Sequence, residues 1–403
     1  MRLISLLILL SVGTVLCPKS AQLNPRLCLR KDFSRAKAQR RKENLLETRQ
    51  RFASLRLCAR NLLRIRLLVH SLGTVAAQTP DTRERLDKLR AEGYEALYNL
   101  DYQGARKRFR EMIQLAPDDP AGPQCYAASL WVEQLNQSWE LKATLYSTKA
   151  YTDGKQETDR AQTAEFRKWI RQAKILAEAK LKKDSRDFEA LYFLGAADGL
   201  DAAYSAAVEK KYRAALGKGS DAVDRHKELL KLAPDFRDAE LTVGLQNYIV
   251  GSLPLPLKMI AGTMGVRGSK KRGLETLERV SIEGHWARDL ARVLLVDLYK
   301  REKRWKDAVA TARVLSEKYP RNYLFKLQMA DALASQIVTL RKAKGATATT
   351  GSVEEKELVS IFDSLSHDKT LERSTAELVQ FRYREARVAL SQPLEKSRSG
   401  HKN

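Results

Sequence analysis

The residues most able to carry out chemistry are few and widely separated in this chain. Histidine binds metals and transfers protons at neutral pH, and the five histidines are His70, His226, His285, His367 and His401. None belongs to a His-Glu-x-x-His pair, and the sequence contains no Cys-x-x-Cys pair and no Gly-x-Ser-x-Gly nucleophile elbow. We therefore expect no catalytic residue, no metal and no cofactor.

Other reactive residue types have structural explanations. Cys125 is the only cysteine after residue 58 and is expected to be a buried core residue. The pair Asp118-Asp119 precedes an expected helix, where capping explains carboxylates. The stretch Gly262–Lys270 has the wrong glycine spacing for a phosphate-binding loop, and it leads into the basic triplet Lys270–Arg272, which is expected to be solvated surface.

The strongest candidates for binding are aromatic and apolar residues. Tyr192, Tyr204, Tyr212 and Tyr248 fall on neighbouring expected helices, where they either clamp a peptide or pack in the core. The insertion Leu253-Pro254-Leu255-Pro256-Leu257, followed by Lys258, is expected to be an apolar loop. It could plug the array, dock a partner or contact a membrane. The candidate partner-binding residues are Tyr192, Tyr204, Tyr248, Leu253, Pro254 and Lys258.

Charge is distributed unevenly along the 403 residues, whose formal net charge is +24. Residues 1–77 hold 16 Lys or Arg and three Asp or Glu, a net charge of +13, which leaves only +11 for residues 78–403. The longest apolar run, Leu3–Leu16, is shorter than the ~20 residues of a membrane-spanning helix. The sequence therefore excludes a polytopic membrane protein.

The N-terminal region resembles a leader. Residues 1–22 have a basic and then an apolar part, as signal peptides do, but the residues around Cys17 suit cleavage poorly. A second signal-like segment covers 62–78, where Val75 and Ala77 favour cleavage before Gln78. Residues 23–80 are a basic arm, a disordered linker or the product of a mis-set translation start. We expect export to the periplasm or cell envelope, or a cytoplasmic protein if the N-terminus is retained.

From residue 82 onward the pattern is helical. Apolar residues recur every three or four positions, prolines cluster at segment ends, and β-branched alternation is nearly absent. The spacing also repeats. Gly93, Ala105 and Pro117 are twelve residues apart, as are Val296, Ala308 and Pro320, and as are Ala222 and Pro234. Small residues ten positions after these prolines, among them Gly244, complete a period of 34.

This period resembles the tetratricopeptide repeat, a helix–turn–helix unit of the same length. The residues that carry the resemblance are Gly93, Ala105, Phe109, Pro117, Ala222, Pro234, Gly244, Tyr299, Ala308 and Pro320. Ala96, Met112 and Val296 depart from the family's preferences. The residues Leu253, Pro254, Lys258, Gly262, Gly268, Gly273 and Leu274 are similar to a signature of bacterial repeat proteins of this family and of the eukaryotic inclusion-body-clearance type.

The resemblance implies an all-α solenoid, a right-handed superhelix of helix–turn–helix repeats, over residues 82–340. Long inserted helices and loops interrupt it, one of them rich in aromatic residues at Trp131, Trp139 and Tyr146. We expect a flexible loop at 341–352, capping helices within 353–391 and a disordered tail at 392–403.

A solenoid presents a long concave surface, so the expected function is a non-catalytic protein–protein interaction scaffold that binds a peptide or partner protein there. Two alternatives stay open. The basic N-terminal arm could bind nucleic acid or another anionic polymer, although a body of low net charge makes nucleic acid a poor partner. An enzyme could also be built in the central insertions. Membrane association is expected only through the N-terminal segment.

Overall fold

The computed structural model describes residues 80–137, 160–263, 266–344, 352–369, 371 and 373–391. All regular structure in these residues is helical, which confirms an all-α protein over this part of the chain. The chain divides into two compact units, and the smaller one, Cys17–Glu84, is described only from Pro80. The larger unit holds the described residues from Arg85 onward. Within the described ranges, no helix is long and apolar enough to cross a bilayer.

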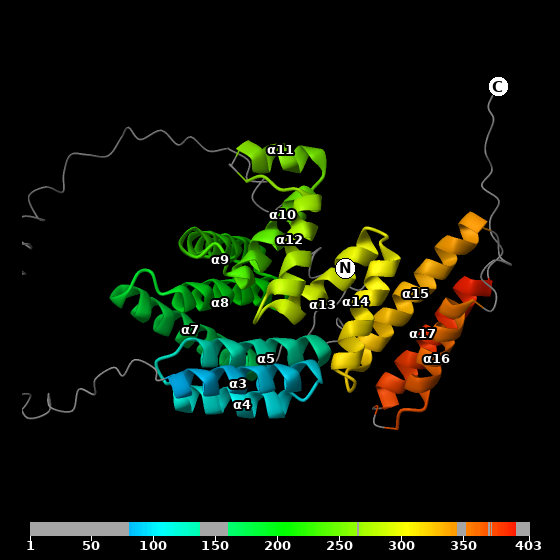
Figure 1. The fold of residues 1–403 in the computed structure, drawn as a ribbon, viewed down its shortest axis with the longest axis horizontal. Helices are drawn as coiled ribbons and strands as arrows, with labels where there is room; N and C mark the ends of the chain where they lie inside the picture. Colours follow the sequence, from blue (N-terminus) through cyan, green and yellow to red (C-terminus); the bar gives the residue numbers. More distant parts are fainter. Residues whose placement is uncertain are drawn as a thin grey trace, which may run out of the picture. The chain divides into compact units, whose positions relative to one another are not determined.

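The helices in chain order are α3 (Pro80–Tyr98), α4 (Tyr102–Leu115), α5 (Ala121–Gln137), α7 (Arg160–Lys183), α8 (Phe188–Ala207), α9 (Tyr212–Leu232), the short 3-10 helix η3 (Arg237–Ala239), α10 (Glu240–Gly251), α11 (Leu255–Thr263), α12 (Lys270–Glu283), α13 (Arg288–Arg301), α14 (Trp305–Lys318), α15 (Tyr323–Lys344), α16 (Val353–Ser366) and α17 (Arg373–Ser391) (Figure 1). Helices that follow each other in the sequence pack against each other, from α4 on α5 to α16 on α17. At α11 this order is interrupted, because α10 packs instead on α12.

A similar turn joins the two helices of a pair at three separate places, although the amide after its central residue donates to a carbonyl five residues back at Leu100 and Lys303 and six residues back at Lys210. Its central residue has a positive φ: 65° at Leu100, 57° at Lys210 and 60° at Lys303. Each of these residues stands two positions before the next helix begins with an aromatic residue. Non-glycine residues seldom adopt this left-handed conformation, so its recurrence at equivalent places marks a repeated backbone unit.

The second helix of each of these pairs also ends in the same way. Ala116, Ala233 and Tyr319 each leave the helical conformation with φ between −123° and −138°, and each precedes a proline. Proline disfavours the helical conformation in the residue before it, so the chain must extend there. The backbone N–H of the residue three positions further along then donates a hydrogen bond to the carbonyl oxygen of Ala116, Ala233 or Tyr319 at 3.0–3.1 Å.

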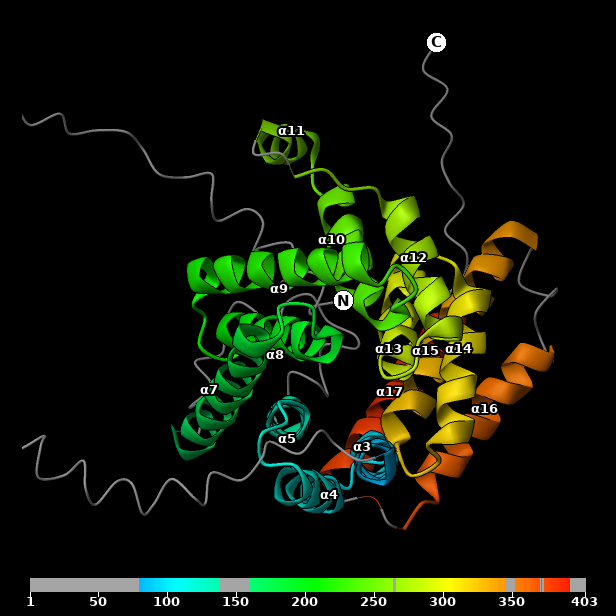
Figure 2. The ribbon, with the colours of Figure 1, turned by 60° about the vertical axis from the view of Figure 1, so that its left-hand side comes forward.

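The buried apolar residues form two large clusters, one mainly from α3–α9 and one mainly from α10–α17, and a small third cluster of Val280, Ala287 and Ala291. Helix α3 packs against residues far along the sequence. The ring of Tyr98 lies 5.0 Å from that of Tyr319, and the Asn322 side-chain amide donates to the Tyr98 carbonyl oxygen at 2.7 Å. Arg90 on the same helix lies over the ring of Trp286 at 4.2 Å. Two views of the ribbon show α3 beside the lower end of α14 (Figures 1 and 2).

Two elements differ from their predictions. The helix α15 continues to Lys344, into the loop expected at 341–352. Residues 253–257, expected to be a loop because of Pro254 and Pro256, instead lead into and begin the helix α11. Proline is tolerated in the first helical turn, where its missing N–H has no intrahelical partner to lose. The predicted leader before residue 80, the aromatic residues Trp139 and Tyr146, the middle of the predicted loop at 345–351 and the tail from 392 lie outside the described residues.

Candidate functional site

The three tyrosines predicted to contact a partner lie in the core. Tyr192 on α8 is surrounded by other rings, with centroid distances of 5.1 Å to Phe193, 5.4 Å to His226, 5.4 Å to Phe236 and 5.1 Å to Trp286. Burial raises the pKa of its hydroxyl. A ring enclosed in this way fills space between helices and is not accessible to a peptide at the surface.

Tyr204 and Tyr248 are also fully buried, and their hydroxyls are satisfied inside the protein. The Tyr204 ring stacks on Phe166 at 3.8 Å, and its oxygen lies 2.8 Å from Gln134 Oε1. The Tyr248 hydroxyl donates to Glu302 Oε1 at 2.6 Å. A buried tyrosine normally finds such a partner, so both side chains act as structural links between helices.

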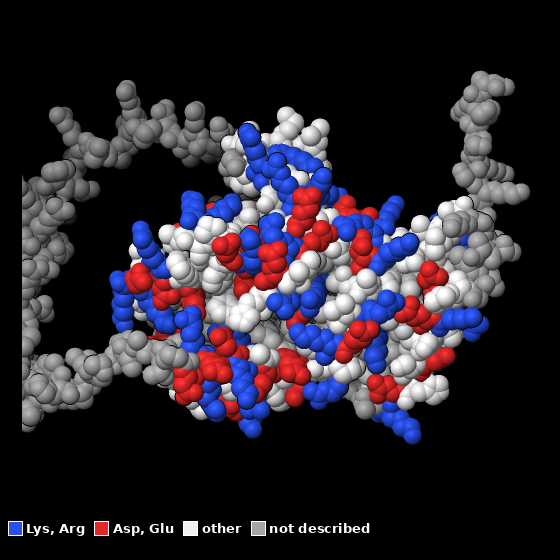
Figure 3. All heavy atoms as spheres, viewed as in Figure 1, with Lys and Arg blue, Asp and Glu red and all other residues white. Residues whose placement is uncertain are grey.

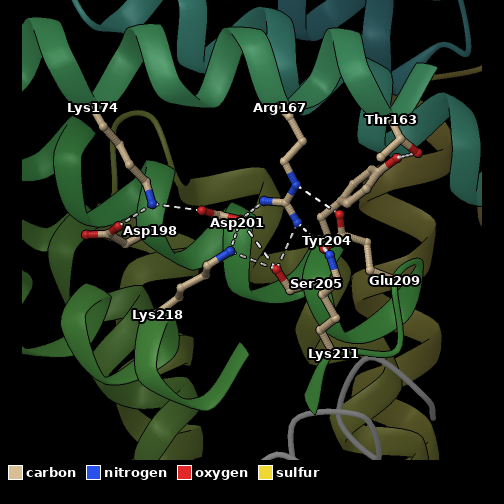
Figure 4. A network of polar contacts seen from close by, with 10 residues as sticks. All are labelled: Thr163, Arg167, Lys174, Asp198, Asp201, Tyr204, Ser205, Glu209, Lys211 and Lys218. Carbon is tan, nitrogen blue, oxygen red and sulfur yellow. Dashed lines mark hydrogen bonds and ion pairs between the residues drawn. The ribbon is translucent and has the colours of Figure 1, made fainter. Parts of the chain in front are cut away.

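Sequence reasoning did not identify a polar cluster that lies between α7, α8 and α9 (Figure 4). Its centre is Asp201 on α8, which is 5% exposed. Lys174 Nζ of α7 lies 2.8 Å from Asp201 Oδ2, Lys218 Nζ of α9 lies 2.7 Å from Oδ1, and Arg167 pairs with the same carboxylate. Asp198, one helical turn earlier on α8, pairs with Lys174 Nζ at 2.7 Å. The cluster therefore ties three helices together through α8.

The charges in this cluster hold one another ionised. Burial alone would raise the pKa of Asp201, but hydrogen bonds from Lys174 and Lys218, with the positive charges of Lys174 and Arg167, lower it to about 2. The contact of Lys218 Nζ with Ser205 Oγ at 3.0 Å resembles a serine–lysine pair used in catalysis. That pair needs a neutral lysine and an accessible hydroxyl. Lys218 is instead ion-paired with Asp201, and Ser205 is fully buried. The geometry favours a structural role.

The remaining predicted residues lie in the α11 segment, which we define as the described residues 252–263 and 266–269. Leu253 is buried and anchors the segment, whereas Pro254 and Lys258 are exposed. Leu255 and Met259, one helical turn apart, are 71% and 66% exposed, among the highest values for large apolar side chains in the described residues. Large exposed apolar side chains that lie close together mark interaction sites more often than isolated ones do. The α11 segment is therefore the candidate binding site.

The base of the α11 segment is held by contacts between backbones. An added Cβ at Gly251 would lie 2.3 Å from the Lys270 nitrogen, and one at Gly273 would lie 2.5 Å from the Tyr248 nitrogen. Lys270 Nζ also binds Glu302 Oε1 at 2.9 Å. Because α10 and α12 meet so closely, both ends of the α11 segment are fixed.

Gly251→Ala is expected to lower the free energy of unfolding by about 1–3 kcal/mol, because the new methyl group meets backbone that cannot rotate away. Gly217→Ala on α9 is the matched control, since nothing lies within 4 Å of its added Cβ. There the better helix propensity of alanine should raise stability by up to about 1 kcal/mol. Urea denaturation of both purified variants measures the difference, and shifts of equal sign would contradict this packing.

Neither the comparisons with known proteins nor the arrangement of possible metal ligands assigns a function to the chain. No protein-family model matches the chain, and no curated protein matches it significantly. Among the residues whose structure is described, no group of three or more His, Cys, Asp or Glu side chains is arranged to hold a metal ion.

Proposed function

We propose that this protein is a non-catalytic protein–protein interaction scaffold, built as a tetratricopeptide-type solenoid in which longer helices and the α11 segment are inserted. The observation that carries the proposal is the recurrence of one helix–turn–helix unit. The pairs α3–α4, α8–α9 and α13–α14 share the left-handed turn residue at Leu100, Lys210 and Lys303 and the same extended residue before a proline.

The small residues of the predicted period support the same proposal. Ala105, Ala222 and Ala308 are buried between helices. An added Cβ at Gly93 would lie 2.3 Å from Phe109, and one at Gly244 would lie 3.0 Å from Thr276. Pro117, Pro234 and Pro320 are exposed beyond the helix ends, and Tyr299 donates to Glu278 at 2.9 Å across neighbouring helices. Small residues therefore stand where helices approach most closely, as a repeat of this kind requires.

The partner surface in this proposal is the concave face, which the first helices of successive pairs line in such an array. Because Tyr192, Tyr204 and Tyr248 are buried, we expect half-buried side chains on the same helices to contact the peptide or partner protein. Leu200 on α8 and Leu245 on α10 are two of these. Neither carries a charge that would limit the partner to one sign.

Site-specific photo-crosslinking in the native host tests this surface. A photoreactive residue in place of Leu200 or Leu245 should capture a discrete protein, which mass spectrometry can identify. Leu232, exposed at the end of the second helix α9, is the control position and should not capture the same protein. Equal capture at Leu232, or no capture at Leu200 and Leu245, would contradict a protein-binding concave face.

We further propose that the protein is exported, with cleavage before Gln78 that removes most of the excess positive charge. Mass spectrometry of the native protein from separated cellular fractions should find Gln78 as the first residue in the periplasmic or envelope fraction. An intact Met1 in the cytoplasm would contradict export and leave the basic N-terminal residues as a functional part of the protein.

A further inference from the structure

The structure points to a lipid-binding role for the α11 segment. We propose that this segment docks the protein on an anionic lipid surface, where Leu255 and Met259 enter the bilayer interface and nearby Lys and Arg side chains contact the headgroups. The proposal goes beyond the scaffold function, because it concerns lipid and uses a different part of the fold. Neither proposal depends on the other.

The first observation is the exposure of the apolar residues. Leu255 and Met259 are four residues apart on α11, so they lie on one face of the helix. They are 71% and 66% exposed, although leucine and methionine are usually buried. Pro254 and Pro256 are exposed beside them. Proline restricts the backbone before binding, which reduces the entropy lost when the segment enters an interface.

The second observation is the charge around these residues. Residues 241–274 contain five Lys or Arg residues and no Asp or Glu. Lys270 pairs with Glu302 and Lys271 with Glu275, whereas Lys258, Arg267 and Arg272 are exposed. The surface over α11 is accordingly blue and white in the space-filling view (Figure 3). An exposed cluster of basic side chains is attracted to anionic headgroups.

The third observation is the position of the segment. In both ribbon views α11 stands away from the other helices, and its main contact is with α10 (Figures 1 and 2). The glycine contacts of Gly251, Gly268 and Gly273 fix its base, each with an added Cβ within 2.5 Å of a neighbouring atom. A projecting element on a rigid base can enter an interface without any rearrangement of the array.

These features together fit a lipid surface better than other anionic partners. Basic residues beside exposed apolar ones are typical of helices that lie in the membrane interface. Nucleic acid would make use of the charge but not of Leu255 and Met259. An acidic protein groove could use both, and this partner is distinguished in the experiment below.

The test is flotation of the purified full chain with vesicles of phosphatidylcholine alone and of phosphatidylcholine with phosphatidylglycerol. The wild type should bind the anionic vesicles and not the neutral ones. Leu255→Ser/Met259→Ser should weaken binding about tenfold or more, because both apolar side chains then stay in water. Lys258→Glu/Arg267→Glu should weaken it by a similar factor, and added salt should release the wild type.

Matched controls lie outside the segment. Ile282 on α12, also 71% exposed, and Val314 on α14, 45% exposed, supply the apolar control Ile282→Ser/Val314→Ser. Lys182→Glu/Lys183→Glu at the exposed end of α7 is the control for charge. Both controls should bind within about twofold of the wild type, beyond a small general effect of net charge for the second. A tryptophan in place of Met259 should be quenched by brominated lipid, whereas one in place of Ile282 should not.

The outcomes separate the possible sources of binding. Binding that survives both α11 variants would overturn the proposal and assign lipid contact to the basic N-terminal residues. Absence of any binding to anionic vesicles would also overturn it. Capture of a protein by a photoreactive residue at position 259 in cells, without vesicle binding, would identify a protein as the partner of this segment. None of these results changes the expectation for crosslinking at Leu200 and Leu245.

Discussion

Asp201→Asn is expected to lower the free energy of unfolding by about 3–5 kcal/mol, the largest effect we expect from a single substitution in the polar cluster. The substitution removes the negative charge shared by Lys174, Lys218 and Arg167 while it keeps the size of the side chain. Lys174 would keep Asp198 and Arg167 would keep Glu209, but Lys218 would be left half-buried beside them without its carboxylate. Removal of one partner from a buried ion pair costs far more than the pair itself contributes, because the remaining charge stays desolvated.

Chemical denaturation monitored by circular dichroism measures this loss. The matched control is Asp221→Asn on α9, since Asp221 is exposed and substitutions at such positions usually change stability by no more than about 0.5 kcal/mol. Helix content at low denaturant should remain the same in both variants. A loss below about 1 kcal/mol for Asp201→Asn would show that water reaches the cluster and that it does not hold α7, α8 and α9 together.

His226 is expected to make the protein less stable as the pH falls from 6.5 to 4. This side chain on α9 is only 2% exposed. Its Nε2 lies 3.0 Å from the Tyr192 carbonyl oxygen, which can only accept, so Nε2 carries the hydrogen of the neutral ring. Nδ1 lies 2.9 Å from the Thr242 hydroxyl and accepts from it. Protonation of the ring would add a hydrogen to Nδ1, which could then no longer accept from the Thr242 hydroxyl.

The direction of the effect follows from the pKa of His226 in the two states. Burial lowers this pKa from 6.5 to about 4 in the folded protein, against smaller opposing effects of the Tyr192 carbonyl and Asp198. Between these two values the unfolded chain binds a proton that the folded protein does not bind, so stability rises with pH across that window. The shift corresponds to about 3 kcal/mol lost by pH 4 and retained above pH 6.5.

Denaturation of the wild type and of His226→Gln between pH 7 and pH 4 measures this contribution. Glutamine cannot be protonated, and its amide can still donate to the Tyr192 carbonyl oxygen. The variant should therefore lose less stability over this range than the wild type, even if it is less stable at pH 7. His285→Gln, at an exposed position, is the control and should follow the wild type. Parallel curves for wild type and His226→Gln would contradict the lowered pKa of His226.

Asp201 acts over a different range, which keeps the two effects apart. Its pKa is lowered from 3.8 to about 2 in the folded state. The stability it contributes is therefore fully present above pH 3.8 and is lost as the pH falls further. Acid unfolding above pH 4 is consequently not a measure of the Asp201 cluster.

Several features of the fold could be predicted from the sequence because they depend on local chemistry. A proline disfavours the helical conformation in the residue before it wherever the chain goes next, so Pro117, Pro234 and Pro320 predicted helix ends. Apolar residues at helical spacing indicated which residues form helices. The C-terminal helices were expected within 353–391, and α16 and α17 occupy Val353–Ser366 and Arg373–Ser391.

The candidate site was predicted only in part. The sequence singled out Leu253, Pro254 and Lys258 because two closely spaced prolines in an apolar stretch are unusual. It did not indicate that α11 forms a helix, or that Leu255 and Met259 would be left exposed. Burial depends on what the other helices cover, and α10 packs on α12 in a way that leaves the residues between them outside.

Tertiary structure alone decided the roles of the polar and aromatic residues. The sequence does not distinguish four cluster residues from ordinary surface charges, because their partners lie between 17 and 27 residues away on other helices. These residues are Asp198, Asp201, Lys174 and Lys218. Tyr192 could equally have lined a groove, until Trp286 and Phe236 closed over it. The sequence by itself determined the helices and their repeated turns, which arise from neighbours along the chain. Which side chains are enclosed, paired or left in water arises from residues far apart, and only the packed fold brings these together.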